Sequence, residues 1–114
     1  MAAGESPVIF GDGTQTRDFT YIANAVAANL LAMKHPTPLL GVTYNVGTGG
    51  RVSLLDLVNT LNKIYGTSLI PELRETRAGD VRDSQASLER ITAAIGYRPI
   101  VDFEEGLRRT VAAI

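Results

Sequence analysis

A turn bracketed by two glycines, residues 11–19 with the sequence Gly-Asp-Gly-Thr-Gln-Thr-Arg-Asp-Phe, constrains the fold more than any other stretch. Its glycines allow left-handed backbone angles and the close approach of a ligand. Asp12 and Thr14 can bond neighbouring amides and fix the turn. Arg17 is then presented from a rigid base, and a guanidinium suits a planar, bidentate acceptor such as a phosphate or carboxylate. These residues alone leave two interpretations open, a ligand contact or a hairpin turn with an exposed arginine.

Length and composition bound the class of protein. The 114 residues have room for one modest core, and 45% hydrophobic with 20% charged residues indicate a soluble globular protein. A formal net charge of -1 gives no reason to expect nucleic acid or an anionic membrane as a partner. With no cysteine and a single histidine, His35, neither a zinc site nor a Ser-His-Asp triad with a recognisable nucleophile elbow can be assembled. We expect no bound metal, no membrane span and a cytoplasmic protein.

Short strands and about four helices are predicted, which gives the α/β class. The chain shows no internal repeat and no linker, so we expect one domain over residues 1–114. Extended segments are predicted over residues 7–10, 17–22 and 42–46, and again from Pro71.

Capping residues place the helices. Asn24 is the expected N-cap of a helix over residues 25–33, and because that helix is apolar nearly all round we expect it to be buried on more than one side. Ser53 and Asp102 open two further helices with capping patterns, and Ser87 is expected to cap the remaining one.

Residues 9–22, Ile-Phe-Gly-Asp-Gly-Thr-Gln-Thr-Arg-Asp-Phe-Thr-Tyr-Ile, closely resemble a signature of the extended short-chain dehydrogenase/reductase family, specifically its nucleotide-sugar epimerases and dehydratases. Residues 44–49, 77–86 and 103–108 are similar to later landmarks of the same family, in the same order. The resemblance is closest to UDP-sugar 4-epimerases and concerns their C-terminal, substrate-binding part. It implies a small substrate-binding domain of mixed α/β structure.

The resemblance also implies which residues bind the substrate. Its Arg-x-Gly-Asp pattern matches Arg77 and Asp80, which in the family hold the UDP diphosphate and ribose region. It implies further that Arg17 joins Arg77 on the diphosphate and that the uracil lies against the backbone of Val8 to Phe10. Without the resemblance, Arg77 and Asp80 would be interpreted as a surface ion pair.

Cofactor binding is not expected of this chain. The segment Gly47-Thr48-Gly49-Gly50 imitates a dinucleotide fingerprint, but Val52 and Ser53 stand where the two common spacings require a third glycine. We interpret it as a structural turn.

Catalytic residues are not expected either. The resemblance implies that the family transfers hydride to NAD, held by an N-terminal Rossmann half, with a tyrosine and a lysine four positions later as the acid/base pair. No tyrosine here has that lysine, since Tyr21, Tyr44, Tyr65 and Tyr97 are followed four residues on by Ala25, Thr48, Leu69 and Val101. Whether the chain acts as an enzyme is left open.

Three functions stay open from the sequence. The chain is a substrate-binding domain of a UDP-sugar epimerase or dehydratase, or a non-catalytic module that pairs with itself or with a Rossmann-domain chain, or a self-sufficient enzyme of another kind. The expected partners are a weakly bound UDP-sugar, a Rossmann-domain chain and a second copy in a homodimer. The dimer is expected because the apolar helix over residues 25–33 would otherwise expose a large patch.

Overall fold

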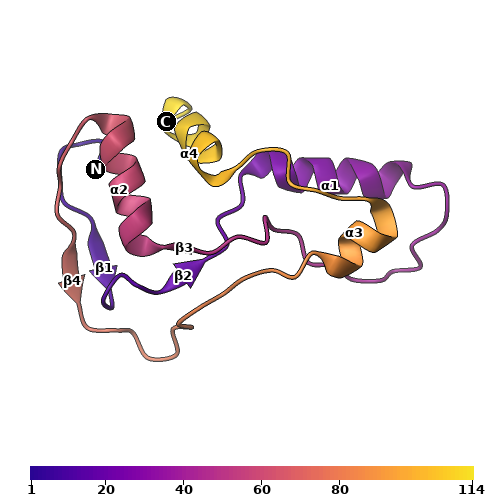
Figure 1. Cartoon of the computed structure of the whole chain (residues 1–114), viewed down its shortest axis with the longest axis horizontal. Coiled ribbons are helices and arrows are strands. Elements are labelled where there is room, and N and C mark those ends of the chain that lie inside the picture. Colours follow the sequence, from indigo (N-terminus) through magenta and orange to yellow (C-terminus); the bar gives the residue numbers. More distant parts are fainter. The chain divides into compact units, whose positions relative to one another are not determined.

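The computed structural model describes all 114 residues, which divide into two compact units. The first unit comprises residues 1–17 and 51–84, and the second residues 18–50 and 85–114. Four helices and four short strands confirm the predicted mixed α/β class (Figure 1). No helix has the length and apolar character needed to cross a membrane. The single domain predicted from the sequence stays a prediction.

The first unit is built on two strand pairs and one helix. The strand β1 (Val8–Phe10) pairs in parallel with β4 (Glu72–Arg74), and β2 (Thr16–Arg17) pairs antiparallel with β3 (Val52–Ser53) (Figure 1). The helix α2 (Leu54–Tyr65) begins at Ser53, whose hydroxyl oxygen accepts from the Asp56 amide at 3.0 Å, and ends at Gly66, which has φ 67°. The predicted cap of this helix is confirmed.

The second unit contains α1 (Ile22–Lys34), α3 (Glu89–Ile95) and α4 (Phe103–Ala112). Its core holds Ala28, Ile91 and Tyr97, with Tyr44, Leu88 and Ile95 packed against them. The predicted cap of α4 is confirmed, because Asp102 accepts from the Glu105 amide at 2.9 Å. Gly106 lies inside α4 because a Cβ there would come 2.6 Å from the Tyr21 Cβ.

The predicted start of α1 is wrong. Asn24 is not its N-cap but lies inside the helix, fully buried. Its Oδ1 accepts from the amides of Ile100 and Val101 at 2.8 and 3.0 Å, and its Nδ2 donates to the Val101 carbonyl at 2.8 Å. These tertiary bonds explain the buried asparagine. The helix begins two residues earlier, at Ile22, and in the segment before it only Thr16 and Arg17 form a strand.

Three other predictions also need correction. Residues 42–46 form no strand because no neighbouring segment pairs with them, and Tyr44 contributes its side chain to the core instead. Ser87 does not cap α3, whose N-cap is Leu88 without a side-chain bond. Only Asn24 and Ala28 of α1 are buried, so this helix is not enclosed on several sides as expected.

Replacing Asn24 with alanine is expected to destabilise the fold by about 2 to 4 kcal/mol, because two amides and one carbonyl lose their partner in a buried site. Chemical denaturation measures this change. The matched control is Asn29→Ala on the same helix, where the exposed amide donates only to the Ala25 carbonyl and the change is expected to stay within about 0.5 kcal/mol. Equal effects of the two substitutions would contradict the role assigned to Asn24.

Candidate substrate-binding site

The glycine turn has the conformation that the sequence predicts. Gly11 and Gly13 have φ 125° and 81°, and the carboxylate of Asp12 accepts from the Thr14 hydroxyl at 2.7 Å and from its amide at 2.9 Å. Those bonds, together with a smaller effect of Arg82, lower the pKa of Asp12 to about 2. The turn is therefore fixed by an ionised side chain over the whole physiological range.

Arg17 forms most of its hydrogen bonds with backbone carbonyls of its own chain. Its guanidinium donates to the carbonyls of Thr16 at 2.7 Å, Val81 at 2.6 Å and Arg82 at 3.1 Å. Three of the five guanidinium N–H groups are thereby used, which leaves two for a ligand. Arg17 thus anchors the segment that follows Asp80, whatever else it binds.

Arg77 lies over an aromatic ring. Its guanidinium carbon is 3.7 Å from the centroid of the Phe10 ring, which brings two of the predicted site residues together. Arg77 forms no ion pair with Asp80, whose amide instead donates to the Arg77 carbonyl at 3.2 Å in a tight turn. The surface ion pair considered from the sequence is therefore absent, and the Arg77 guanidinium has no carboxylate partner.

Val8 and Phe10 lie on a strand with one unpaired edge. The Pro7 carbonyl accepts from the Glu72 amide and the Gly11 amide donates to the Arg74 carbonyl, so residues 7, 9 and 11 direct their backbone groups toward β4. Because backbone groups alternate along a strand, those of Val8 and Phe10 point to the opposite edge, where no strand pairs. That edge offers, in order, the Val8 N–H, the Val8 carbonyl and the Phe10 N–H.

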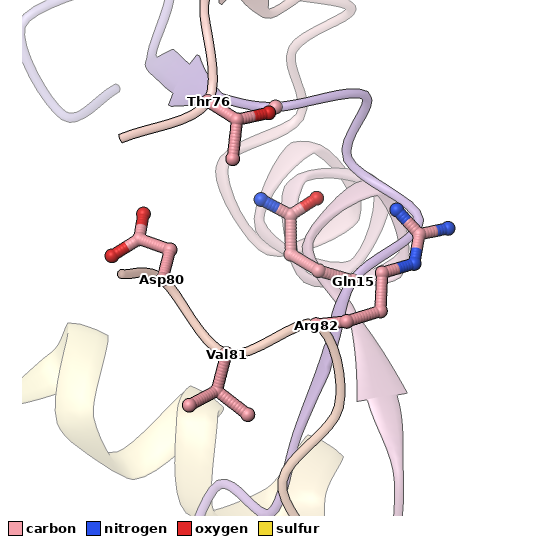
Figure 2. A pocket seen from close by; sticks show the side chains of 6 residues that line it. Gln15, Thr76, Asp80, Val81 and Arg82 are labelled. Atoms are coloured by element: carbon pink, nitrogen blue, oxygen red, sulfur yellow. The ribbon is translucent and has the colours of Figure 1, made fainter. Parts of the chain in front are cut away.

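A small cavity of about 80 Å³ opens at the carboxyl ends of β1 and β4 (Figure 2). Its lining residues are Gly11, Gln15, Thr76, Asp80, Val81 and Arg82. In open α/β sheets, ligands bind in the crevice outside the carboxyl ends of parallel strands. The sequence did not predict that Gln15 lines this cavity, because a single glutamine in a turn is not typical of any kind of site. Only its position within the signature of residues 9–22 could have pointed to it.

The glycine-rich segment 47–50 is closed by an internal carboxylate. Asp18 accepts from the amides of Thr48 at 3.0 Å, Gly49 at 2.9 Å and Ala86 at 3.3 Å, and from the Thr48 hydroxyl. A Cβ on Gly47 would lie 2.6 Å from the Asp18 carboxylate. The residues present therefore do not fit a dinucleotide phosphate, whose place among these amides is taken by Asp18. No group of three or more His, Cys, Asp or Glu side chains comes together to hold a metal ion.

Comparison with known proteins gives the family. The NAD dependent epimerase/dehydratase family matches residues 1–47. A putative UDP-glucose 4-epimerase of Methanocaldococcus jannaschii is 32% identical over 111 residues, which cover 97% of this chain and 35% of that protein. The chain belongs to the NAD-dependent epimerase/dehydratase family. It spans about one third of the length of the relatives it matches.

Solved structures of the family agree with the fold. The UDP-glucose 4-epimerase of Thermotoga maritima, crystallised with UDP-glucose, is 38% identical with a TM-score of 0.89, over 98% of this chain and 35% of that one. The UDP-glucuronic acid 4-epimerase of Bacillus cereus, in complex with UDP-glucuronic acid and NAD, is 33% identical with a TM-score of 0.83, over 89% and 32%. Family membership thus rests on sequence and on structure.

Replacing Asp18 with asparagine is expected to destabilise the protein at pH 7 by about 2 kcal/mol, because an amide nitrogen would then face backbone donors. Partial burial raises the pKa of Asp18, but the bonds from Thr48, Gly49 and Ala86 outweigh burial and hold it below the ordinary value of 3.8. The stabilisation is therefore complete above that ordinary value and is lost as the pH falls through the lower folded pKa. The variant, which does not titrate here, should approach the parent protein in stability as the pH falls below about 4.

Denaturation with urea from pH 7 to pH 2 tests this expectation. The control is Glu104→Gln, which removes an exposed carboxylate paired with Arg108 at 3.0 Å and should cost less than about 1 kcal/mol. A difference between Asp18→Asn and the parent that does not change with pH would show that the charge of Asp18 has no role.

Proposed function

We propose that this chain is the UDP-sugar-binding part of an NAD-dependent UDP-sugar 4-epimerase or dehydratase, and that it is not catalytic by itself. The observation that carries this proposal is the unpaired edge of β1 beside Arg77, which is stacked on Phe10. Two parts of a UDP-sugar find complementary groups here: the uracil base at the edge of β1, and the diphosphate at Arg17 and Arg77. Relatives crystallised with UDP-glucose or UDP-glucuronic acid support the ligand class.

The base is matched by backbone groups. The imide edge of uracil presents a carbonyl, an N–H and a second carbonyl. The edge of β1 presents a donor, an acceptor and a donor, from the Val8 N–H, the Val8 carbonyl and the Phe10 N–H. Because the Phe10 carbonyl is already bonded to the Gln15 side chain at 2.9 Å, this row of three groups ends at the Phe10 N–H.

The diphosphate is matched by two arginines. Arg77 has no carboxylate partner, and Arg17 keeps two free N–H groups while its carbonyl bonds hold it in place. Asp80 lies in the neighbouring cavity, where it meets hydroxyl groups rather than phosphate oxygens. We expect weak binding, because few contacts offset the ordering of the ligand.

Hydride transfer needs groups that this sequence does not contain, since no tyrosine is followed by a lysine four residues on. A Rossmann-domain chain that supplies NAD and the acid/base pair would provide the chemistry, and this chain would position the sugar nucleotide. UDP-sugar and such a Rossmann-domain chain are therefore its proposed partners.

Titration with UDP, followed in an amide NMR spectrum, tests the proposal. UDP is expected to shift the Val8 and Phe10 amides with a dissociation constant of about 1 mM, and Arg77→Ala to weaken binding by about tenfold. Arg17→Ala should also weaken UDP binding, but it removes the bonds of Arg17 to the Val81 and Arg82 carbonyls as well. Arg77→Ala therefore tests the diphosphate contact more directly. NAD is expected to shift nothing, and UDP-glucose should not be converted.

The matched control removes the paired arginines of α4, Arg108 and Arg109, which bond Glu104 and Glu105 at 3.0 and 2.7 Å. Their replacement by alanine should leave UDP binding unchanged. The proposal fails if UDP shifts neither strand amide, if Arg77→Ala binds UDP like the parent, or if NAD binds saturably.

A second candidate function, an interaction module that forms a homodimer, is favoured by the surface of α1. Four apolar residues spaced by four, four and three positions form one stripe along this helix, and all are exposed: Ile22 at 65%, Val26 at 49%, Leu30 at 44% and Met33 at 80%. Burial of about 400 Å² per subunit at about 25 cal/mol per Å² would favour association by several kcal/mol before its entropic cost.

Light scattering after size exclusion, over a wide concentration range, tests the dimer. The parent chain should approach twice the monomer mass of 12.2 kDa at high micromolar concentration, and Leu30→Lys should keep it monomeric. The control is Ile100→Lys, which charges an exposed apolar residue outside the stripe and should leave the dimer intact. A monomer at every concentration would contradict this function without bearing on UDP binding.

A further inference from the structure

Residues 75–83, which we call the strap, carry Arg77 and have no buried apolar anchor. Every residue of the strap is exposed, and residues 75–80 make no hydrogen bond to the rest of the chain. A cavity of about 80 Å³ lies between the strap and the glycine turn, since residues of both line it (Figure 2). A segment with few buried apolar contacts opens locally at a low cost in free energy. The strap is therefore expected to open while the rest of its unit stays folded.

Polar contacts at residues 81–83 hold the strap against the glycine turn. The Arg17 guanidinium donates to the carbonyls of Val81 at 2.6 Å and Arg82 at 3.1 Å. The Thr16 amide also donates to the Arg82 carbonyl, at 3.1 Å. Water competes for exposed hydrogen bonds, so each of these contributes only a modest net stabilisation. The backbone of the strap is thus fixed at one place by bonds that can break.

The Arg82 side chain adds a second connection between the strap and the turn. Its guanidinium donates to both carboxylate oxygens of Asp12, at 3.1 and 3.2 Å, and to the Thr14 hydroxyl, and it points away from Asp80 (Figure 2). Asp12 and Thr14 are bonded to each other in the bonds that fix the turn. Because both partners of Arg82 belong to a fixed turn, these bonds restrict where the strap can lie.

The position of Arg77 depends on the strap. Between the end of β4 and residue 81 the only backbone bond is internal, from the Asp80 amide to the Arg77 carbonyl. The place of Arg77 over the Phe10 ring is thus set by the two ends of the strap and by the stacking contact itself. Freeing one end lowers the fraction of molecules in which Arg77 lies beside β1. The apparent affinity for a ligand of Arg77 falls in proportion to that fraction.

We propose that the strap opens and closes over the end of β1, that Arg82 is the positioning residue that holds it closed, and that the diphosphate of UDP selects the closed form through Arg77. This inference rests on the proposed function. UDP stabilises the closed strap by the same factor by which closure strengthens UDP binding. Uridine has the base but no phosphate, so its binding to the edge of β1 does not depend on the strap.

Arg82→Ala tests the proposal, with UDP and uridine as probes and the Val8 and Phe10 amide signals as the readout. The variant should bind UDP about threefold to fivefold more weakly than the parent chain, and uridine with unchanged affinity. In the Arg77→Ala background the same substitution should not weaken UDP binding further, because the arginine that the strap positions is absent.

The matched control is Arg74→Ala. It removes the same charge as Arg82→Ala from a residue that precedes the strap and is paired with Glu72 at 2.8 Å. UDP binding should stay unchanged in this variant. An effect of Arg82→Ala that this control does not reproduce is therefore not an effect of net charge on an anionic ligand.

Amide hydrogen exchange measures the opening of the strap without a ligand. The Ser84 amide donates to the Thr16 carbonyl and the Thr16 amide to the Arg82 carbonyl, so both bonds break when the strap opens. Arg82→Ala should speed the exchange of these two amides at least about threefold, and UDP should slow it in the parent chain. The Leu55 amide, which donates to the Gly13 carbonyl at 3.0 Å, is the internal control and should not change.

Four results would overturn the inference while the proposed function stands. They are a UDP affinity of Arg82→Ala equal to that of the parent, an equal loss for UDP and uridine, an equal loss in Arg74→Ala, and an additive loss in the Arg77→Ala background. If no nucleotide binds the parent chain, the proposed function fails, and exchange decides the role of Arg82: unchanged rates at Ser84 and Thr16 in Arg82→Ala overturn it, and faster rates support it.

Discussion

The carboxylate of Asp18 is the interaction on which the second unit depends. It ties its own segment to two others, since its partners are the amides of Thr48 and Gly49 in one segment and of Ala86 in another. The same segment is held from another direction by Tyr97, a fully buried residue whose hydroxyl donates to the Gly47 carbonyl at 2.6 Å. Burial and the nearby charge of Asp18 both raise the pKa of Tyr97, so this donor keeps its proton. Hydrogen bonds to the Asp18 carboxylate and from the Tyr97 hydroxyl thus hold residues 47–49 in place.

The first unit uses the neighbouring residues of the signature in a comparable way. The Thr16 amide donates to the Arg82 carbonyl and the Thr16 carbonyl accepts from Ser84, while Arg17 bonds the carbonyls of Val81 and Arg82. The residues that identify the family by sequence therefore hold their own chain together before any ligand arrives. In this chain, the signature thus has a structural role of its own, because its backbone groups and the Arg17 guanidinium bond residues 81–84.

Sequence reasoning succeeded where the cause is local. The capping oxygens of Ser53 and Asp102 and the left-handed glycines act within a few residues, so the pattern predicts them. It failed where the partner is distant. Asn24 resembles a cap in sequence, but its partners lie more than seventy residues away, and residues 42–46 alternate like a strand yet find no strand to pair with.

The candidate site shows the same division between local and distant causes. The sequence with its family resemblance indicated Val8, Phe10, Arg17, Arg77 and Asp80, and the structure brings Arg77 onto Phe10. No sequence pattern could show that Arg17 would donate to three backbone carbonyls, or that the Oε1 of Gln15 would lack a hydrogen-bond partner. Both outcomes depend on how residues 76–82 pack against the glycine turn.

The bond from Gln15 to the Phe10 carbonyl also bears on aggregation. An unpaired strand edge is a template on which another chain can add a strand, and short length is one natural defence. In β1 only three residues form the strand, and the side-chain amide of Gln15 occupies the last acceptor of the open edge. An incoming strand would have to displace a buried amide to extend its ladder past Phe10. The short length of β1 and the bonded Phe10 carbonyl thus both oppose growth of this edge into a larger sheet.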